Sequence, residues 1–156
     1  KYPQELHWEN VPEYLSKVKA SAFREELKAD EVLITADTVV CIHDRILGKP
    51  ADRKEAISML RELSGNRHLV VTGVSVTTRT EQLSFSSRTD VFFKRLSNEE
   101  IEFYVDTYKP FDKAGAYGIQ EWIGYIGIER IEGSFYNVMG LPIQKLYETL
   151  RKLQFQ

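Results

Sequence analysis

Two isolated charged residues have positions that suit phosphate chemistry. Asp37 lies inside the β-branched run 31–42, where a lone carboxylate is unfavourable unless it is paired, hydrogen-bonded or bound to a metal ion. Lys49 lies between a glycine and a proline, which restrict the backbone and suit a lysine that meets a phosphate oxygen as a point charge. Each also has an ordinary interpretation. Asp37 could bond backbone amides at a strand break, and Lys49 could be a solvated lysine.

The segment 112–120, Asp-Lys-Ala-Gly-Ala-Tyr-Gly-Ile-Gln, combines charged, amide and aromatic side chains with two glycines. No apolar period of a helix or a strand accounts for it. Glycines among polar side chains favour a backbone folded closely around a small polar ligand. A simple turn would also use Gly and Asp, so the segment alone leaves both interpretations open.

Other reactive residue types give weaker signals. Lys19 adjoins the apolar stripe of an expected helix, and most such lysines extend to water. Cys41, the single cysteine, lies in an apolar run and is interpreted as a core residue rather than a nucleophile. The three histidines lack metal-ligand spacing, and no dinucleotide-binding or P-loop glycine motif is present.

Length and composition predict a single domain, 1–156, of a globular protein. A net charge of −2 with scattered basic residues gives no support for a nucleic-acid or membrane partner. One cysteine allows no intrachain disulfide, which favours a reducing, cytoplasmic location.

The apolar patterns predict a mixed α/β or α+β domain, with a twisted mixed sheet flanked by helices. Capping residues at Asn10, Asp52 and Ser97 mark helix starts, and Gly65 marks a helix end. A turn at 43–45 and another at 79–82 separate expected strands. The expected elements are helix 10–27, strand 31–42, helix 52–63, strands 68–78 and 83–95, helix 97–105, strand 123–131 and a helix after Pro142.

The ordered set of segments resembles the Maf family of nucleoside triphosphate pyrophosphatases, whose fold is like that of inosine triphosphatases. The resemblance covers residues from about 14 to 150 and rests on the order and spacing of its blocks. These blocks are 36–40 (Ala-Asp-Thr-Val-Val), 46–50 (Ile-Leu-Gly-Lys-Pro), 59–65, His68 with 72–74, 104–105, 112–120 and 133–142 (Gly-Ser-Phe-Tyr-Asn-Val-Met-Gly-Leu-Pro).

The resemblance implies hydrolysis of a nucleoside triphosphate to the monophosphate and pyrophosphate with Mg²⁺ or Mn²⁺. It makes Asp37 the acidic catalytic residue, which would accept a proton from water or hold the metal ion. Lys49 and Lys19 would neutralise the phosphates.

The resemblance also makes 112–120 the base-recognition loop, with Asp112, Lys113 and Gly115 as substrate-binding residues. Thr38 and Gln120 fall at positions associated with the choice of base. The Gln amide offers a donor and an acceptor, which suit the edge of uracil or thymine. The form of the loop is similar to that of the dTTP/UTP subgroup.

Two alternatives to this enzyme remain open. One is a non-catalytic nucleotide-binding protein that regulates septum formation, and the other is a house-cleaning pyrophosphatase for deaminated purine triphosphates. A homodimer is an expected assembly. The pair Asp37 and Lys49 favours the enzyme, because a protein that only binds nucleotides needs no buried carboxylate near the phosphates.

The sequence departs from the family pattern at its start, because the family's first strand and its Ser-x-x-Arg-Arg phosphate-binding loop have no counterpart after Lys1. We therefore expect an N-terminally truncated domain with an unpaired sheet edge that invites dimerisation. A protein whose intact mass confirms that it starts at Lys1 should hydrolyse triphosphates poorly. Full turnover by that protein would contradict the expectation.

Overall fold

A computed structural model describes residues 1–153, so the last three residues of the expected domain lie outside the described part. The elements along the chain are α1 (Val11–Ser21), β1 (Leu33–Ile42), β2 (Arg45–Leu47), α2 (Arg53–Leu63), β3 (Arg67–Thr77), β4 (Gln82–Phe93), α3 (Asn98–Tyr108), α4 (Trp122–Gly127), β5 (Ile128–Glu132), α5 (Phe135–Met139) and α6 (Ile143–Arg151). Single turns of 3₁₀ helix occur at Trp8–Asn10 (η1), Arg24–Glu26 (η2) and Ala114–Ala116 (η3).

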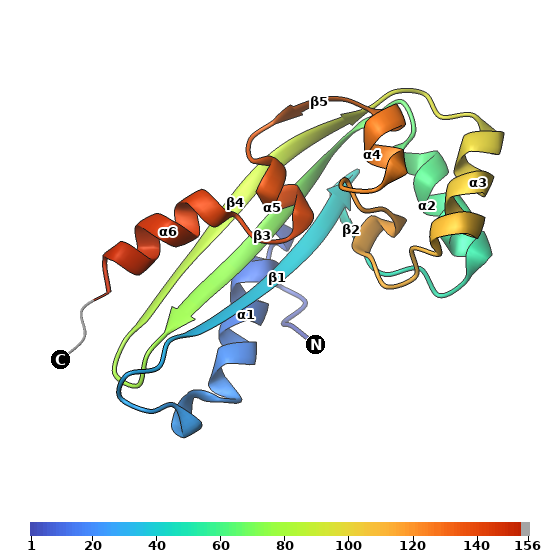
Figure 1. Ribbon diagram of the computed structural model, residues 1–156. Helices are drawn as coiled ribbons and strands as arrows, with labels where there is room; N and C mark the ends of the chain where they lie inside the picture. Colours follow the sequence, from blue (N-terminus) through green and yellow to red (C-terminus); the bar gives the residue numbers. More distant parts are fainter. Residues whose placement is uncertain (154–156) are drawn as a thin grey trace.

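The strands form one sheet in the order β2-β1-β3-β4-β5. This arrangement confirms the expected α/β class, with helices against a twisted sheet (Figure 1). Among the described residues every strand pair is antiparallel, whereas a mixed sheet was expected. Short turns connect β1 to β2 and β3 to β4, and a short turn can join only antiparallel neighbours, which accounts for two of the four pairs.

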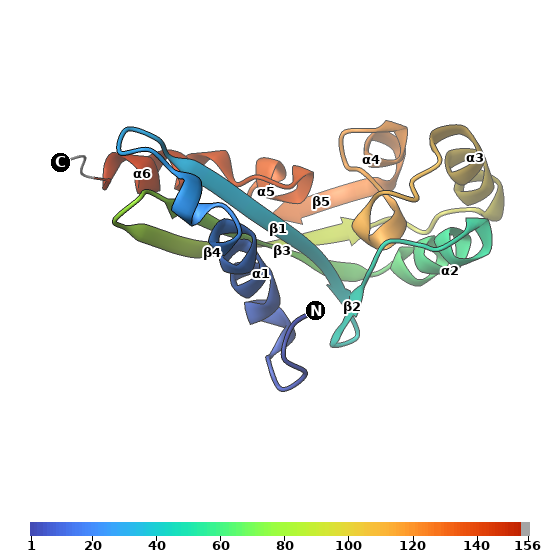
Figure 2. The same cartoon turned by 90° about the horizontal axis from the view of Figure 1, so that it is seen from below.

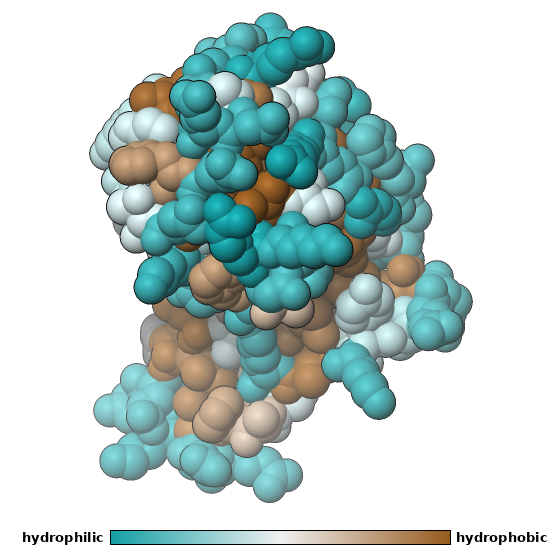
Figure 3. Space-filling model, turned by 90° about the vertical axis from the view of Figure 1, so that its right-hand side faces the viewer, coloured by the Kyte–Doolittle hydropathy of each residue, from teal (hydrophilic) through white to brown (hydrophobic). Residues whose placement is uncertain are grey.

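Helices cover both faces of the sheet, as the view from below shows (Figure 2). Helix α1 lies on one face, and α5 and α6 lie on the other. Helices α2 and α3 pack together at one end, beside α4. Figure 3 looks at this end, where hydrophilic residues cover most of the nearer surface around a small hydrophobic spot.

The main core lies between the sheet, α2, α3 and the segment 114–123. Its largest fully buried side chains include Tyr104, Leu60 and Ile123. A smaller cluster joins α1 to its face of the sheet through Val11, Val39, Cys41 and Val71. A third joins α6 through Val74, Val76 and Leu146.

Helix starts and tight turns follow the sequence closely. Ser97 and Glu100 form a complete capping box at α3, and the Asp52 carboxylate accepts from the Glu55 amide at α2. Gly65 has φ +68°, the left-handed conformation expected after α2. Asn10 is the exception, because its side chain makes no capping hydrogen bond.

Helix α1 differs from its prediction in length and in its buried side. It ends at Ser21 rather than near 27, and its buried residues are Val11, Pro12, Ser16 and Ala20. Val18 and Phe23, expected to face inward, are about half exposed. Small residues line the contact instead, because the helix backbone lies directly against β3. The Ser16 hydroxyl is 2.7 Å from that of Ser75.

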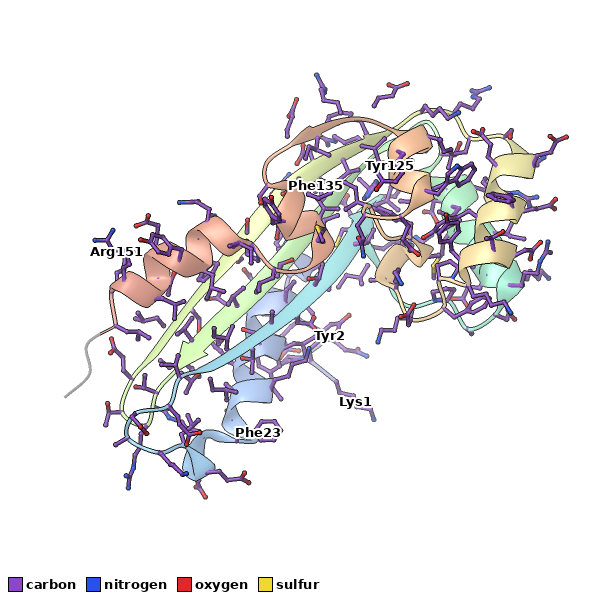
Figure 4. The ribbon with its side chains drawn as sticks, viewed as in Figure 1. Lys1, Tyr2, Phe23, Tyr125, Phe135 and Arg151 are labelled. Atoms are coloured by element: carbon purple, nitrogen blue, oxygen red, sulfur yellow. The ribbon has the colours of Figure 1, made fainter. Side chains whose placement is uncertain are left out.

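Two short helices replace expected strand and loop. A strand was expected over 123–131, but residues 122–127 form α4 and only the second half of the range belongs to a strand, β5. Burial of Ile123 and the close fit of Gly124 against the Ile119 carbonyl decide the helix. Figure 4 shows Tyr125 of α4 and Phe135 of α5, the second of these short helices.

The contact between α1 and β3 depends on the missing side chain of Gly73. A Cβ at this position would lie 2.1 Å from the Glu13 nitrogen of α1. Gly73→Ala should therefore lower the free energy of unfolding by about 1–3 kcal/mol or more, because α1 must move away from the sheet. Denaturant unfolding measures the loss.

Gly48→Ala is the matched control, because a Cβ there meets nothing within 4 Å. It should change the free energy of unfolding by less than about 0.5 kcal/mol. Equal effects of the two substitutions would contradict the close packing at Gly73.

His68 makes the stability depend on pH. It is 1% exposed, and burial lowers its pKa from 6.5 to about 3. Between these values the unfolded chain binds a proton that the folded chain does not. The free energy of unfolding should therefore fall as the pH is lowered through this window, by about 1.4 kcal/mol per unit.

Denaturant unfolding between pH 7.5 and pH 4 measures this slope, which should be shallower in His68→Phe. Tyr117→Phe is the control, because it removes the hydroxyl 2.6 Å from His68 Nε2 but keeps the imidazole in the core. Identical slopes in wild type and His68→Phe would show that His68 does not titrate on unfolding.

Candidate functional site

The predicted site residues meet at a cavity of about 330 Å³ beside β1. Strand β2 pairs only with residues 40–42 of β1, and no described strand continues along that edge over residues 33–39. The cavity therefore has access to side chains from both faces of the sheet. Its lining includes Asp37, Thr38, Lys19, Lys49, Asp112, Lys113 and Gln120, which is every predicted site residue except Gly115.

Asp37 pairs with Lys19 across this edge. The Lys19 ammonium donates to Asp37 Oδ1 at 3.0 Å and to the Ala36 carbonyl at 2.9 Å. The Asp37 side chain is 21% exposed and that of Lys19 is 50% exposed, so both are accessible from the cavity. Asp37 is thus held by a lysine, rather than by the backbone amides that the ordinary interpretation required. Register explains the contact, because Asp37 lies opposite Gly73, where α1 approaches the sheet.

Two further lysines enter from the opposite wall. Lys113 lies 3.2 Å from the Asp112 carboxylate and 3.8 Å from that of Glu121. The Lys113 hydrogen bond and charge hold the pKa of the exposed Asp112 carboxyl below its ordinary value, and Lys49 adds to the effect. The backbone next to Lys49 is bonded to the segment 112–120, because the Gly48 carbonyl accepts from the Gly115 amide at 3.1 Å. The cavity is thus lined by three lysines and two aspartates.

Segment 112–120 is a tight loop held from behind. Gly115 and Ala116 both have left-handed φ, at +70° and +62°, and a Cβ on Gly115 would lie 3.0 Å from Val40. Gly115 therefore shapes the loop and does not line the cavity. The Tyr104 hydroxyl accepts from the Gly118 amide at 3.1 Å and donates to Glu121 at 2.8 Å. Burial raises the pKa of Tyr104, so the hydroxyl keeps its proton for Glu121.

The floor and one wall of the cavity contain residues to which the sequence gave no role. Tyr117 is buried in the floor, where its hydroxyl lies 2.6 Å from His68 Nε2 and burial raises its pKa. Val138, Met139 and Gly140 form the wall at the end of α5. The signal for this wall was present, because 133–142 is one of the blocks of the resemblance. The sequence could not show that this block would fold over Thr38.

The carboxylates of the cavity can supply some, but not all, of the ligands of a divalent cation. Mg²⁺ is commonly held by one or two carboxylates together with substrate phosphates. Asp37, with Asp112 across the cavity, offers such carboxylates and leaves the other positions to phosphate and water. Within residues 1–153 there is no group of three or more Cys, His, Asp or Glu residues placed to hold a metal ion alone.

Cys41 and Trp122 lie outside the cavity. Cys41 is buried on the α1 face, and burial raises its pKa to about 12, which supports the core interpretation. Trp122, which follows the loop 112–120, packs on Phe103 with ring centres 4.8 Å apart and is not part of the lining. Among the described helices, none is long and apolar enough to cross a membrane.

Comparison with known proteins identifies the family of the chain. Residues 2–153 match the family model described as Maf-like protein. A Bacteroides thetaiotaomicron protein named dTTP/UTP pyrophosphatase is 57% identical over 97% of this chain and 79% of its own length. Proteins of the same name from Parabacteroides distasonis and Porphyromonas gingivalis are 53% and 57% identical over 96% of the chain, and 78% and 76% of their own lengths are covered.

The family model spans nearly the whole described chain, and its residues include the cavity built from Asp37, Lys49 and the loop 112–120. The chain belongs to the Maf-like protein family.

Proposed function

We propose that this protein is a nucleoside triphosphate pyrophosphatase that hydrolyses dTTP and UTP to the monophosphate and pyrophosphate. The observation that carries the proposal is the cavity, which joins a carboxylate held by a lysine, two further lysines and a pair of polar groups suited to a base. The names of the similar proteins give the same reaction and the same substrates.

Asp37 acts on the water that attacks the α-phosphorus. Its carboxylate accepts the proton of that water as the water oxygen forms a bond to phosphorus and the bond to the pyrophosphate oxygen breaks. Lys19 holds the Asp37 carboxylate in place at 3.0 Å until the substrate arrives. Asp37 is also the carboxylate that would hold a divalent cation, whose chemistry is to activate water and to neutralise phosphate charge.

The lysines stabilise the charge that develops on the leaving pyrophosphate. Lys49, Lys19 and Lys113 reach the cavity from three separate elements, so a triphosphate can be surrounded rather than contacted from one side. The Asp112 carboxylate accepts from the Lys113 ammonium at 3.2 Å, which restrains this lysine in the wall of the cavity. Thr38 and Gln120 bind the base, while the loop held by Gly115 and Tyr104 shapes that end of the site.

The similar proteins are named as pyrophosphatases, which gives no support to a purely regulatory binding protein, and their names specify dTTP and UTP, which gives none to an enzyme for deaminated purines. The expected homodimer and the cytoplasmic location stay predictions.

Asp37→Asn tests the reaction. Pyrophosphate release from dTTP and UTP with Mg²⁺ or Mn²⁺ should fall by at least about 100-fold, because an amide cannot accept the proton of water. The control is Asp30→Asn, an exposed residue outside the cavity, which should retain full turnover.

Measuring pyrophosphate release from CTP, dITP and XTP, as well as from dTTP and UTP, separates the alternative functions. Preference for dITP and XTP would favour the deaminated-purine enzyme. Absence of pyrophosphate release with every nucleotide and both cations would contradict an enzymatic role and leave the binding protein.

A further inference from the structure

The hydroxyl of Thr38 belongs to a chain of hydrogen bonds that runs from the cavity into the sheet. Thr38 Oγ1 lies 2.8 Å from Oγ1 of Thr72, its direct partner on β3. Thr72 is fully buried and does not line the cavity, and its hydroxyl donates to the main-chain carbonyl of Asn137 at 3.2 Å. The base end of the cavity is therefore connected to α5 through a residue that no substrate can touch.

The direction of these hydrogen bonds follows from the last acceptor. A carbonyl oxygen can only accept, so the Thr72 hydrogen is directed at Asn137. The Thr72 oxygen can then accept, and the Thr38 hydrogen is the donor directed at it. The Thr38 oxygen consequently has lone pairs, and no hydrogen, left for a ligand in the cavity.

The reverse direction leads to the same result. If Thr72 donated to Thr38, the Thr38 hydrogen would turn to the Gly140 carbonyl, which lies 3.5 Å away. In both arrangements the hydrogen is used within the protein, and the group left for the cavity is an acceptor. The first arrangement is favoured because its second bond is shorter, at 3.2 Å.

The far end of the chain is fixed by a buried amide. Asn137 Nδ2 donates to the Val70 carbonyl at 3.2 Å and to Thr89 Oγ1 at 2.9 Å. If the side-chain amide of Asn137 were flipped, its oxygen would face the Val70 carbonyl oxygen, and two acceptors would meet without a hydrogen. The orientation of the amide is therefore fixed. These two side-chain hydrogen bonds, to β3 and β4, hold Asn137 in place, and with it the main-chain carbonyl that accepts from Thr72.

Gln120 has no comparable restraint. Its side chain is exposed and makes no hydrogen bond to any other residue in the part of the chain described. A free amide can turn over and exchange its donor for its acceptor, so it satisfies either order of groups on a base. Thr38 is therefore the residue of this pair whose polarity is fixed.

We propose that Thr72 is a specificity-determining residue, which acts by holding the Thr38 hydroxyl as a hydrogen-bond acceptor. The inference rests on the proposed function and concerns the choice among pyrimidines. Uracil and thymine carry a ring N–H between their two carbonyls, and this N–H can donate to Thr38. Cytosine carries a lone pair on the same ring nitrogen, which would face the lone pairs of Thr38 without a hydrogen between them. The site thus takes imide bases and rejects cytosine.

Thr72→Val tests the proposal, since valine has nearly the shape of threonine and leaves the Asn137 carbonyl with its other donor, the Gly140 amide at 3.0 Å. Without Thr72 the Thr38 hydroxyl keeps only the 3.5 Å contact with the Gly140 carbonyl, which is too long to hold its hydrogen, so the hydroxyl can turn and donate to cytosine. The ratio of kcat/KM for UTP to that for CTP should fall about tenfold, mainly through CTP. Thr72→Ser, which keeps the hydroxyl, should restore the wild-type ratio. Calorimetric binding of UMP and CMP should show the same change without turnover.

Thr89→Val is the matched control, because Thr89 is an equally buried threonine that holds Asn137 but does not contact Thr38. It should alter kcat/KM for UTP and CTP by the same factor. An unchanged ratio in Thr72→Val, or an equal change of ratio in Thr89→Val, would overturn the proposal while UTP hydrolysis by the wild type stands. If the wild type hydrolyses neither nucleotide, the proposed function fails, and UMP and CMP binding alone decides the role of Thr72.

Discussion

The pairing of β1 with β3 determines the rest of the site. Their antiparallel register sets Asp37 opposite Gly73 and Thr38 opposite Thr72. Because neighbouring residues of a strand point to opposite faces, one pair receives α1 and the other receives α5. Lys19 reaches Asp37 because Gly73 admits the helix backbone, and the hydrogen bonds of Thr38 continue through Thr72 to Asn137. A shift of one residue would exchange these faces and separate every one of these contacts.

The cavity also shows why its charges come from separate elements. Three lysines on a single helix would repel one another and offer a ligand only one side. Here α1, the segment after β2 and the glycine loop each supply one lysine, and Asp37 and Asp112 partly compensate their charge. The side chains thus leave an excess of positive charge around the cavity, which can accept a polyphosphate.

The roles of the lysine and aspartate candidates came from the resemblance of the ordered segments, whereas local signals in the sequence were enough for the caps of α2 and α3 and for the hairpin turns. Those features depend on residues a few positions apart, such as Ser97 with Glu100. The error at α1 has another cause, because the helix backbone fits directly against Gly73 of β3. Such contacts join segments that are far apart in the sequence, so the periodicity of apolar residues does not reveal them. Thr72 was missed for the same reason: a buried threonine in a strand is ordinary until its partners at positions 38 and 137 are known.

The five residues of helix α5 have two roles, to attach the helix to the sheet and to line the cavity. Asn137 is fully buried and holds the helix to the sheet, whereas Met139, 46% exposed, meets the cavity two residues later. A change of side chain at position 139 therefore alters the surface presented to a ligand without disturbing the anchor. The binding surface and the attachment of the helix can therefore be altered separately, because only a change at position 137 removes the hydrogen bonds that hold α5 to β3 and β4.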